Sequence, residues 1–154
     1  MNNIINNLYS LNVKMISYAE ASKDQSLIPQ LRKLTLYPRS GMNYELNRFE
    51  VISEYREINA SIILSYYQQK LVGWALYSKE PTDFLFPKHD EYSPNGSVLF
   101  EVFVCPEYRK MGIGSEMIKI AKKKAFPEKL SVSAWDNKSI KFYNRFDKWE
   151  LNKL

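Results

Sequence analysis

The sequence predicts one domain of mixed α/β class, with helices flanking a partly parallel sheet. Its 154 residues suit a single domain, and 45% apolar with 25% charged residues is an ordinary globular composition. β-rich runs and helix-periodic stretches follow one another along the chain. In the last third, strands are followed by helices long enough to cross over the sheet. This order implies parallel neighbours there.

The first 60 residues predict one strand and two helices. Residues 1–12 are rich in Asn and are expected to form a loose lead-in, and weak alternation predicts a strand over 13–18. A helix is expected over 24–36, with Asp24 as its N-cap. A second helical stretch is expected over 43–58. The apolar residues of the first helix lie three and four apart, at Leu27, Ile28, Leu31 and Leu34.

The central part predicts three strands. The runs 61–67 and 71–77 are rich in β-forming residues, and the short polar Gln-Gln-Lys segment between them predicts a hairpin. Residues 79–96 contain three Pro and one Gly and are expected to form a long loop. The apolar run 98–104 predicts a strong strand.

The last third alternates helix and strand. A helix is expected over 112–125, a strand over 130–134, a helix over 136–145 with Asp136 as its cap, and a short strand over 149–151. The apolar stripe of the first of these helices is formed by Ile113, Met117, Ile120 and Ala121.

Several classes of protein are disfavoured by composition. With Cys105 as the one cysteine and His89 as the one histidine, the chain has neither an internal disulfide nor a Cys- or His-cluster metal site, and no metal is expected. No apolar run approaches the roughly 20 residues of a membrane span. The start of the chain lacks the cationic and apolar pattern of a secretory leader. A cytoplasmic location with no membrane partner is expected.

Positive charge is concentrated near the C-terminal end. Residues 1–104 hold 10 Lys and Arg against 11 Asp and Glu, whereas residues 105–154 hold 12 against 6. Such asymmetry indicates a polyanionic partner, either nucleic acid, a membrane surface or a phosphorylated cofactor. The alternative is a solvated helix face, because four of the lysines, Lys119, Lys122, Lys123 and Lys124, lie on one helical stretch.

One segment, residues 102–115, has the pattern of an anion site. A strand leads through a turn into a Gly-spaced loop that opens a helix, and Gly112 and Gly114 allow backbone N–H groups to approach an anion. The helix N-terminus adds free donors and a positive dipole end, and Arg109 and Lys110 add charge. The segment is neither a Walker loop nor a dinucleotide fingerprint, because the Gly-Lys-Ser/Thr and the third glycine are missing. It predicts a pyrophosphate site.

The same segment resembles the acyl-CoA-binding motif of the GCN5-related N-acetyltransferases (GNAT), Arg/Gln-x-x-Gly-x-Gly/Ala. The residues that match are Arg109-Lys110-Met111-Gly112-Ile113-Gly114, preceded by Val-Cys-Pro-Glu-Tyr. A second family motif is similar to residues 136–143, Asp-Asn-Lys-Ser-Ile-Lys-Phe-Tyr. The resemblance implies a mixed, mostly antiparallel sheet flanked by helices, a pair of strands that splay at the acetyl-CoA site, and a short C-terminal end.

The resemblance also implies an activity and a set of ligand-binding residues. The expected reaction is direct transfer of an acetyl group from acetyl-CoA to an amine, without a metal. The expected acetyl-CoA-binding residues are Phe103, Val104, Arg109, Lys110, Met111, Gly112, Ile113, Gly114, Ser115 and Asn137.

Two residues are candidates for proton transfer. Tyr143 matches the family tyrosine near the CoA sulfur and is the candidate general acid. The alternative is that it packs the last helix on the sheet. Glu101 lies in an apolar strand where, by alternation, it shares a face with Leu99 and Phe103, and it is the candidate general base. An ion-paired strand carboxylate is the alternative. The backbone N–H of Val104 is expected to polarise the thioester, and Cys105 and His89 are not expected to be catalytic.

The sequence says less about the residues that would bind the amine that accepts the acetyl group, here called the acceptor side. The 79–96 loop combines four acidic residues with aromatic ones, which would suit a cationic amine on a protein or a small molecule. The family's usual residues after the second motif are replaced by Arg145-Phe146-Asp147, and few residues follow, so a homodimer could complete this side. The alternatives are a non-catalytic acyl-CoA-binding module and, less favoured, a basic nucleic-acid-binding module, for which no recognised motif is present.

Overall fold

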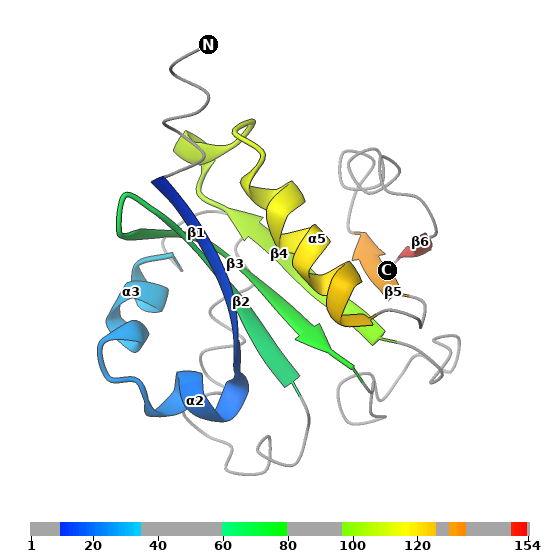
Figure 1. Ribbon diagram of the computed structural model, residues 1–154, viewed down its shortest axis with the longest axis horizontal. Helices are drawn as coiled ribbons and strands as arrows, with labels where there is room; N and C mark the ends of the chain where they lie inside the picture. The colour runs from blue at the N-terminus through cyan, green and yellow to red at the C-terminus, as the bar shows by residue number, and fades with distance from the viewer. Residues whose placement is uncertain (1–9, 35–59, 80–96, 126–129, 135–148, 154) are drawn as a thin grey trace.

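A computed structural model describes residues 10–34, 60–79, 97–125, 130–134 and 149–153. The described strands form one six-stranded sheet whose order in space is the order along the chain (Figure 1). The first four strands are antiparallel, and the β4–β5 and β5–β6 pairs are parallel. The strands are β1 (Leu11–Ser17), β2 (Ala60–Tyr67), β3 (Lys70–Ser78), β4 (Ser97–Val104), β5 (Leu130–Ala134) and β6 (Trp149–Lys153).

Helices cover both faces of this sheet. One face carries α2 (Tyr18–Lys23) and α3 (Leu27–Leu34), and the other carries α5 (Ile113–Ala125), which lies along β4 and β3 (Figure 1). Alternation along the strands therefore divides the core into two clusters. The first packs Trp74 and Phe103 against the leucines of α3, and the second packs Tyr77 and Leu99 against Met117 and Ala121 of α5.

The N-terminal elements differ from the prediction in their bounds. The strand begins at Leu11, inside the expected lead-in, and it ends at Ser17, where the predicted strand continued to Tyr18. Tyr18 opens α2, a helix of six residues that was not predicted and that begins where the Ser17 side chain accepts a hydrogen bond from the Glu20 N–H.

The predicted helix over 24–36 is present as α3, Leu27–Leu34. Asp24 caps it as predicted, since its Oδ1 accepts hydrogen bonds from the N–H groups of Ser26 and Leu27 and from the Ser26 hydroxyl. The predicted face is also confirmed, with Leu27, Leu31 and Leu34 buried.

The predicted hairpin joins β2 and β3 through a tighter turn than the sequence indicated. Only Gln68 and Gln69 lie between the strands, with φ angles of 48° and 66°. Two positive φ angles define a type I′ turn, whose twist matches that of the flanking strands.

The pairing of β3 with β4 contains an irregularity that changes the predicted faces of β4. Leu76 pairs with Glu101 whereas Tyr77 pairs with Leu99, so β4 has one residue more than β3 at this point, a β-bulge. Leu99 accordingly packs under α5, and Phe103 packs under α2 and α3. The expectation that Leu99 and Phe103 share a face is therefore wrong, because strict alternation does not continue through a bulge.

The pairing of β4 with β5 is short. Its register runs from Ser97 with Leu130 to Leu99 with Val132, and the remaining residues of β5, Ser133 and Ala134, are paired with β6 alone. The part of β4 beyond Leu99 is paired with β3 alone among the described strands. The expected splay between two strands is found here.

The predicted helices over 43–58 and 136–145 and most of the 79–96 loop lie outside the described residues. In the C-terminal part, β5 has the predicted bounds and β6 extends two residues beyond the predicted 149–151. Among the described helices, none has the length and apolar character needed to cross a membrane.

A substitution of Gly73 tests the close approach of β3 to β4. A Cβ at this position would lie 2.7 Å from the Phe103 carbonyl oxygen, a backbone atom that cannot move without disturbing the β3–β4 pairing. We expect Gly73→Ala to lower the free energy of unfolding by about 1–3 kcal/mol, measured by chemical denaturation. A variant as stable as the wild type would contradict this packing.

A substitution of Asp24 tests the cap of α3. Hydrogen bonds from the Ser26 hydroxyl, the Ser26 N–H and the Leu27 N–H hold the pKa of the exposed Asp24 carboxyl below its ordinary value. Ionised Asp24 therefore stabilises the folded protein. This contribution is complete above the pKa of an unfolded aspartate, and it is lost as the pH falls through the lower pKa of Asp24 in the folded protein. We expect Asp24→Ala to lower the melting temperature at neutral pH.

Asp24→Asn is the matched variant, because it keeps an acceptor oxygen and removes the titration. We expect Asp24→Asn to keep most of the stability that the cap provides. We expect it to lose the part of the stability that falls at acid pH as Asp24 is protonated. If Asp24→Ala melts at the wild-type temperature, the cap does not stabilise the fold.

Candidate functional site

The segment that joins β4 to α5 forms the candidate site. After Val104 the chain makes a single 3₁₀ turn, Pro106–Tyr108, closed by a hydrogen bond of 2.9 Å from the Tyr108 N–H to the Cys105 carbonyl. The 109–112 loop follows, and α5 begins at Ile113. The predicted helix start at Gly112 is thus confirmed to within one residue.

The first turn of α5 presents backbone donors. The earliest bond of the helix runs from the Glu116 N–H to the Gly112 carbonyl, at 3.1 Å. The N–H groups of Ile113, Gly114 and Ser115 come before it, so they have no acceptor within the helix. Together with the positive end of the helix dipole, these three groups form a site suited to a phosphate oxygen.

The backbone of the 109–112 loop is bent by two residues with positive φ. Lys110 has φ 64° and Gly112 has φ 83°. Apart from its own chain neighbours, no described residue has an atom within 4 Å of the position that a Cβ on Gly112 would occupy, so this position faces open space. Glycine adopts such a conformation without strain, whereas other residues do so rarely.

Tyr108 anchors this loop to the β2–β3 hairpin. Its ring lies 5.7 Å from the ring of Tyr67, at an interplanar angle of 56°, and the Lys70 ammonium lies 5.7 Å from its centroid. Tilted aromatic pairs and cation–π contacts of this geometry are attractive. These contacts hold Tyr108, directly before the 109–112 loop, against the β2–β3 hairpin.

The side chain of Arg109 turns toward the strand that it follows. Its Nε donates a hydrogen bond of 2.8 Å to the Val104 carbonyl, and its guanidinium carbon lies 5.9 Å from the centroid of the Phe103 ring. The guanidinium thus contacts the last two residues of β4.

The end of β4 exposes its backbone toward β5. The Cys105 N–H donates to the Val72 carbonyl at 2.8 Å, toward β3. Because successive backbone groups along a strand point to opposite sides, the N–H and the carbonyl of Val104 point toward β5. The register with β5 has ended five residues earlier, at Leu99. A ligand between the two strands would meet the Val104 N–H.

Nine of the ten predicted binding residues lie together in this region. Met111, in the 109–112 loop, is the one exposed large apolar side chain among the described residues, at 40% exposure. The side chains of Phe103 and Ile113 are buried, so a ligand would meet these two residues through their backbone. The set is Phe103, Val104, Arg109, Lys110, Met111, Gly112, Ile113, Gly114 and Ser115.

The other predicted site residues are not described. Asn137 and Tyr143 lie outside the described residues, as does His89, and the side chain of Glu101 is not described either. Cys105 is 2% exposed and packs in the cluster under α2 and α3.

The lysines of α5 lie away from the loop. Lys119 pairs with Glu116 at 3.0 Å, and the last turn carries Lys122, Lys123 and Lys124, where they complement the negative end of the helix dipole. At 1.5 Å per residue, Lys124 is about 18 Å from Gly112 along the helix.

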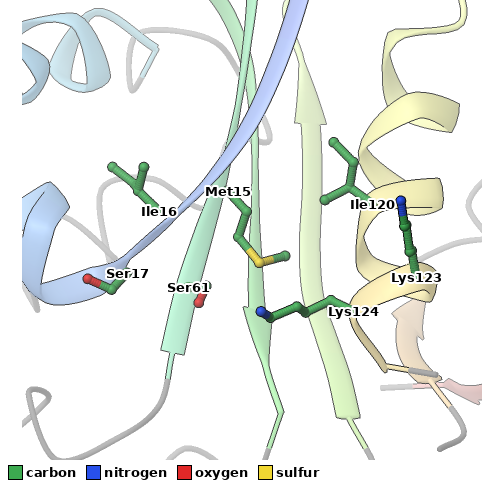
Figure 2. A pocket seen from close by; sticks show the side chains of 7 residues that line it. All are labelled: Met15, Ile16, Ser17, Ser61, Ile120, Lys123 and Lys124. Atoms are coloured by element: carbon green, nitrogen blue, oxygen red, sulfur yellow. The ribbon is translucent and has the colours of Figure 1, made fainter. Parts of the chain in front are cut away.

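A hollow of about 480 Å³ is found at this distant end of α5. Figure 2 shows Lys124 and Met15 reaching into it from the helix and from β1. Its lining residues are Met15, Ile16, Ser17, Ser61, Ile120, Lys123 and Lys124. It contains none of the predicted ligand-binding residues.

Metal ligands do not cluster in the described part of the chain. Within residues 10–34, 60–79, 97–125, 130–134 and 149–153, no group of three or more His, Cys, Asp or Glu is placed to hold a metal ion.

Comparison with known proteins assigns the family. A model described as the acetyltransferase (GNAT) family matches residues 26–147, which is most of the chain. The chain belongs to the GNAT acetyltransferase family. The matched range includes both motifs that the sequence indicated. No curated protein sequence matches the chain significantly.

Solved structures show the same fold at low sequence identity. An aminoglycoside N-acetyltransferase in complex with CoA is 15% identical, with TM-score 0.61, covering 94% of this chain and 91% of its own. An integron cassette protein of V. cholerae is 20% identical, with TM-score 0.59 and coverages of 88% and 83%. A ribosomal-protein-alanine N-acetyltransferase from Brucella melitensis is 17% identical, with TM-score 0.55 and coverages of 88% and 89%.

Two features of the site were not predicted. Tyr108 was noted only as part of the motif, and its contact with Tyr67 joins residues 41 positions apart. The bond from Arg109 to Val104 was missed because Arg109 was read as a charge for an anion. An aromatic residue directly before the arginine was the one sequence signal available.

Proposed function

We propose that this protein is an acyl-CoA-dependent N-acetyltransferase that transfers an acetyl group from acetyl-CoA directly to an amine. One observation carries the proposal: residues 105–112 connect the end of β4, which is not paired with β5, to N–H groups at the start of α5 that have no acceptor within the helix. A pyrophosphate at the helix N-terminus and a thioester at the strand edge would use both features at once.

Backbone N–H groups make the main proposed contacts with acetyl-CoA. The N–H groups of Ile113, Gly114 and Ser115 hold the pyrophosphate, with Lys110 adding charge and Met111 and Asn137 contacting the rest of the donor. The Val104 N–H donates to the thioester carbonyl oxygen, where negative charge develops as the amine attacks.

The proposed proton transfers use Glu101 and Tyr143. The amine must be neutral to attack, and Glu101 accepts its proton, directly or through water. The tetrahedral species collapses with cleavage of the C–S bond, and Tyr143 donates a proton to the departing thiolate. The attacking nitrogen loses its extra proton, which water carries to the Tyr143 phenolate. The products are the acetylated amine and free CoA, and no covalent enzyme intermediate and no metal is required.

The proposed acceptor is a cationic amine. Acidic and aromatic residues of the 79–96 loop support it, and so do two similar structures whose acetyltransferases are named for aminoglycosides and for ribosomal-protein alanine. We further propose a single domain acting in the cytoplasm, with a homodimer completing the acceptor side, and without nucleic acid as a partner.

The function is tested by following free thiol release from acetyl-CoA over a panel of amines that includes aminoglycosides, polyamines and lysine peptides. Mass spectrometry of the same mixtures identifies the acetylated product. We expect amine-dependent thiol release and a matching mass increase of one acetyl group. CoA binding without turnover on any amine would instead favour the non-catalytic acyl-CoA-binding module.

Gly112 tests the pyrophosphate site. Valine at this position would place its side chain in the space before the α5 N-terminus and would favour a negative φ that withdraws the N–H donors. We expect Gly112→Val to weaken CoA binding by at least about 2–3 kcal/mol in calorimetry, from steric exclusion and lost donors. Unchanged affinity in a folded variant would remove the loop as the binding site.

Tyr143 tests the general acid. A hydroxyl that protonates the thiolate acts in the transition state, so Tyr143→Phe should lower kcat by roughly 10²-fold or more while CoA affinity stays nearly constant. The ring is retained, and a thermal melt checks that packing survives. Full turnover would exclude the acid role, and equal losses of stability and activity would indicate a packing role.

A further inference from the structure

We propose that Arg109 is a positioning residue for the acetyl-transfer reaction, acting through the Val104 backbone rather than through its charge on the donor. The proposal rests on the proposed function. Its structural basis is the 2.8 Å hydrogen bond from the Arg109 Nε to the Val104 carbonyl, with the guanidinium against the Phe103 ring.

The peptide between Val104 and Cys105 is held at both ends. Its N–H donates to the Val72 carbonyl at 2.8 Å on the β3 side, and its carbonyl accepts from Arg109 on the β5 side. In a regular sheet the neighbouring strand would satisfy this carbonyl, but the register with β5 ends at Leu99. Arg109 supplies the donor that β5 does not supply.

Fixing this peptide also fixes the adjoining one. The Val104 N–H, which points to the same side as the bound carbonyl, keeps its direction only while the end of β4 stays extended. An oxyanion donor displaced by about 1 Å loses much of its effect on the transition state, whereas substrate affinity depends on it far less. Loss of the Arg109 contact should therefore affect kcat more than CoA binding.

Three substitutions separate position from charge. Glutamine carries its side-chain nitrogen on Cδ, as arginine carries Nε, so Arg109→Gln keeps an N–H donor at that point and removes the charge. Arg109→Lys keeps the charge and moves the nitrogen one bond further. Arg109→Ala removes both. Lys110→Asn is the matched control, since it removes the neighbouring charge from a residue at φ 64°, which asparagine tolerates.

We expect Arg109→Ala to lower kcat about 10- to 100-fold, with the Kd for CoA changing by less than about fivefold. Arg109→Gln should restore most of kcat and Arg109→Lys should restore less. Lys110→Asn should instead weaken CoA binding, which is the effect of removing a charge that contacts the donor. Rescue by lysine but not by glutamine, or a loss confined to CoA affinity, would overturn the proposal.

A spectroscopic readout tests the contact without activity. Cys105 is the one cysteine of the chain and follows a valine, so ¹⁵N-cysteine with carbonyl-¹³C-valine labelling yields one signal, from the Val104 carbonyl. We expect this carbon to move upfield in Arg109→Ala and to stay near the wild-type position in Arg109→Gln. An unchanged signal in Arg109→Ala would overturn the proposal. Failure of the wild type to release thiol from acetyl-CoA with any amine would count against the proposed function alone.

Discussion

The early end of the β4–β5 pairing is the constraint on which the site depends. A parallel neighbour normally satisfies the backbone groups along one side of a strand, and here it does so only from Ser97 to Leu99. The rest of β4 remains joined to β3 on its other side. A strand held firmly on one side and open on the other offers backbone donors to a ligand. Further along the chain, the first turn of α5 presents three more N–H groups that have no acceptor within the helix.

The surrounding fold keeps this open edge in place. β3 is buried along Leu71–Ser78, and it approaches β4 closely because Gly73 has no side chain to meet the Phe103 carbonyl. The bulge opposite Leu76 and Tyr77 then turns the end of β4 so that Phe103 packs under α2 and α3. Directly before the 109–112 loop, Tyr108 packs against Tyr67 of β2. The donors are therefore preorganised by packing on both sheet faces, which is the arrangement that electrostatic catalysis requires.

Local sequence patterns predicted much of this arrangement. Contacts between residues that are distant in the sequence were not predicted. Three predicted features each depend on a short stretch of neighbouring residues, and each is present in the structure: the Gly-spaced loop, the start of α5 and the Asp24 cap. Helix α2 was missed because six residues are too few for a helical period to be recognised. The shared face of Leu99 and Phe103 was predicted wrongly, because a bulge arises from the pairing of two strands. The Arg109 contact depends on how the loop folds back over β4, which spacing alone does not encode. The predicted roles of Glu101, Asn137 and Tyr143 stay predictions.

The central claim is that the donor binds where β4 leaves β5 and α5 begins. Amide chemical-shift mapping on addition of CoA to the ¹⁵N-labelled protein tests it most directly. The account predicts that the largest changes fall on the amides of Val104 and of Ile113, Gly114 and Ser115. It also predicts that the amides of Met15, Lys123 and Lys124, at the hollow near the end of α5, change little. Changes concentrated at that hollow, with the amides of the α5 N-terminus unmoved, would contradict the account.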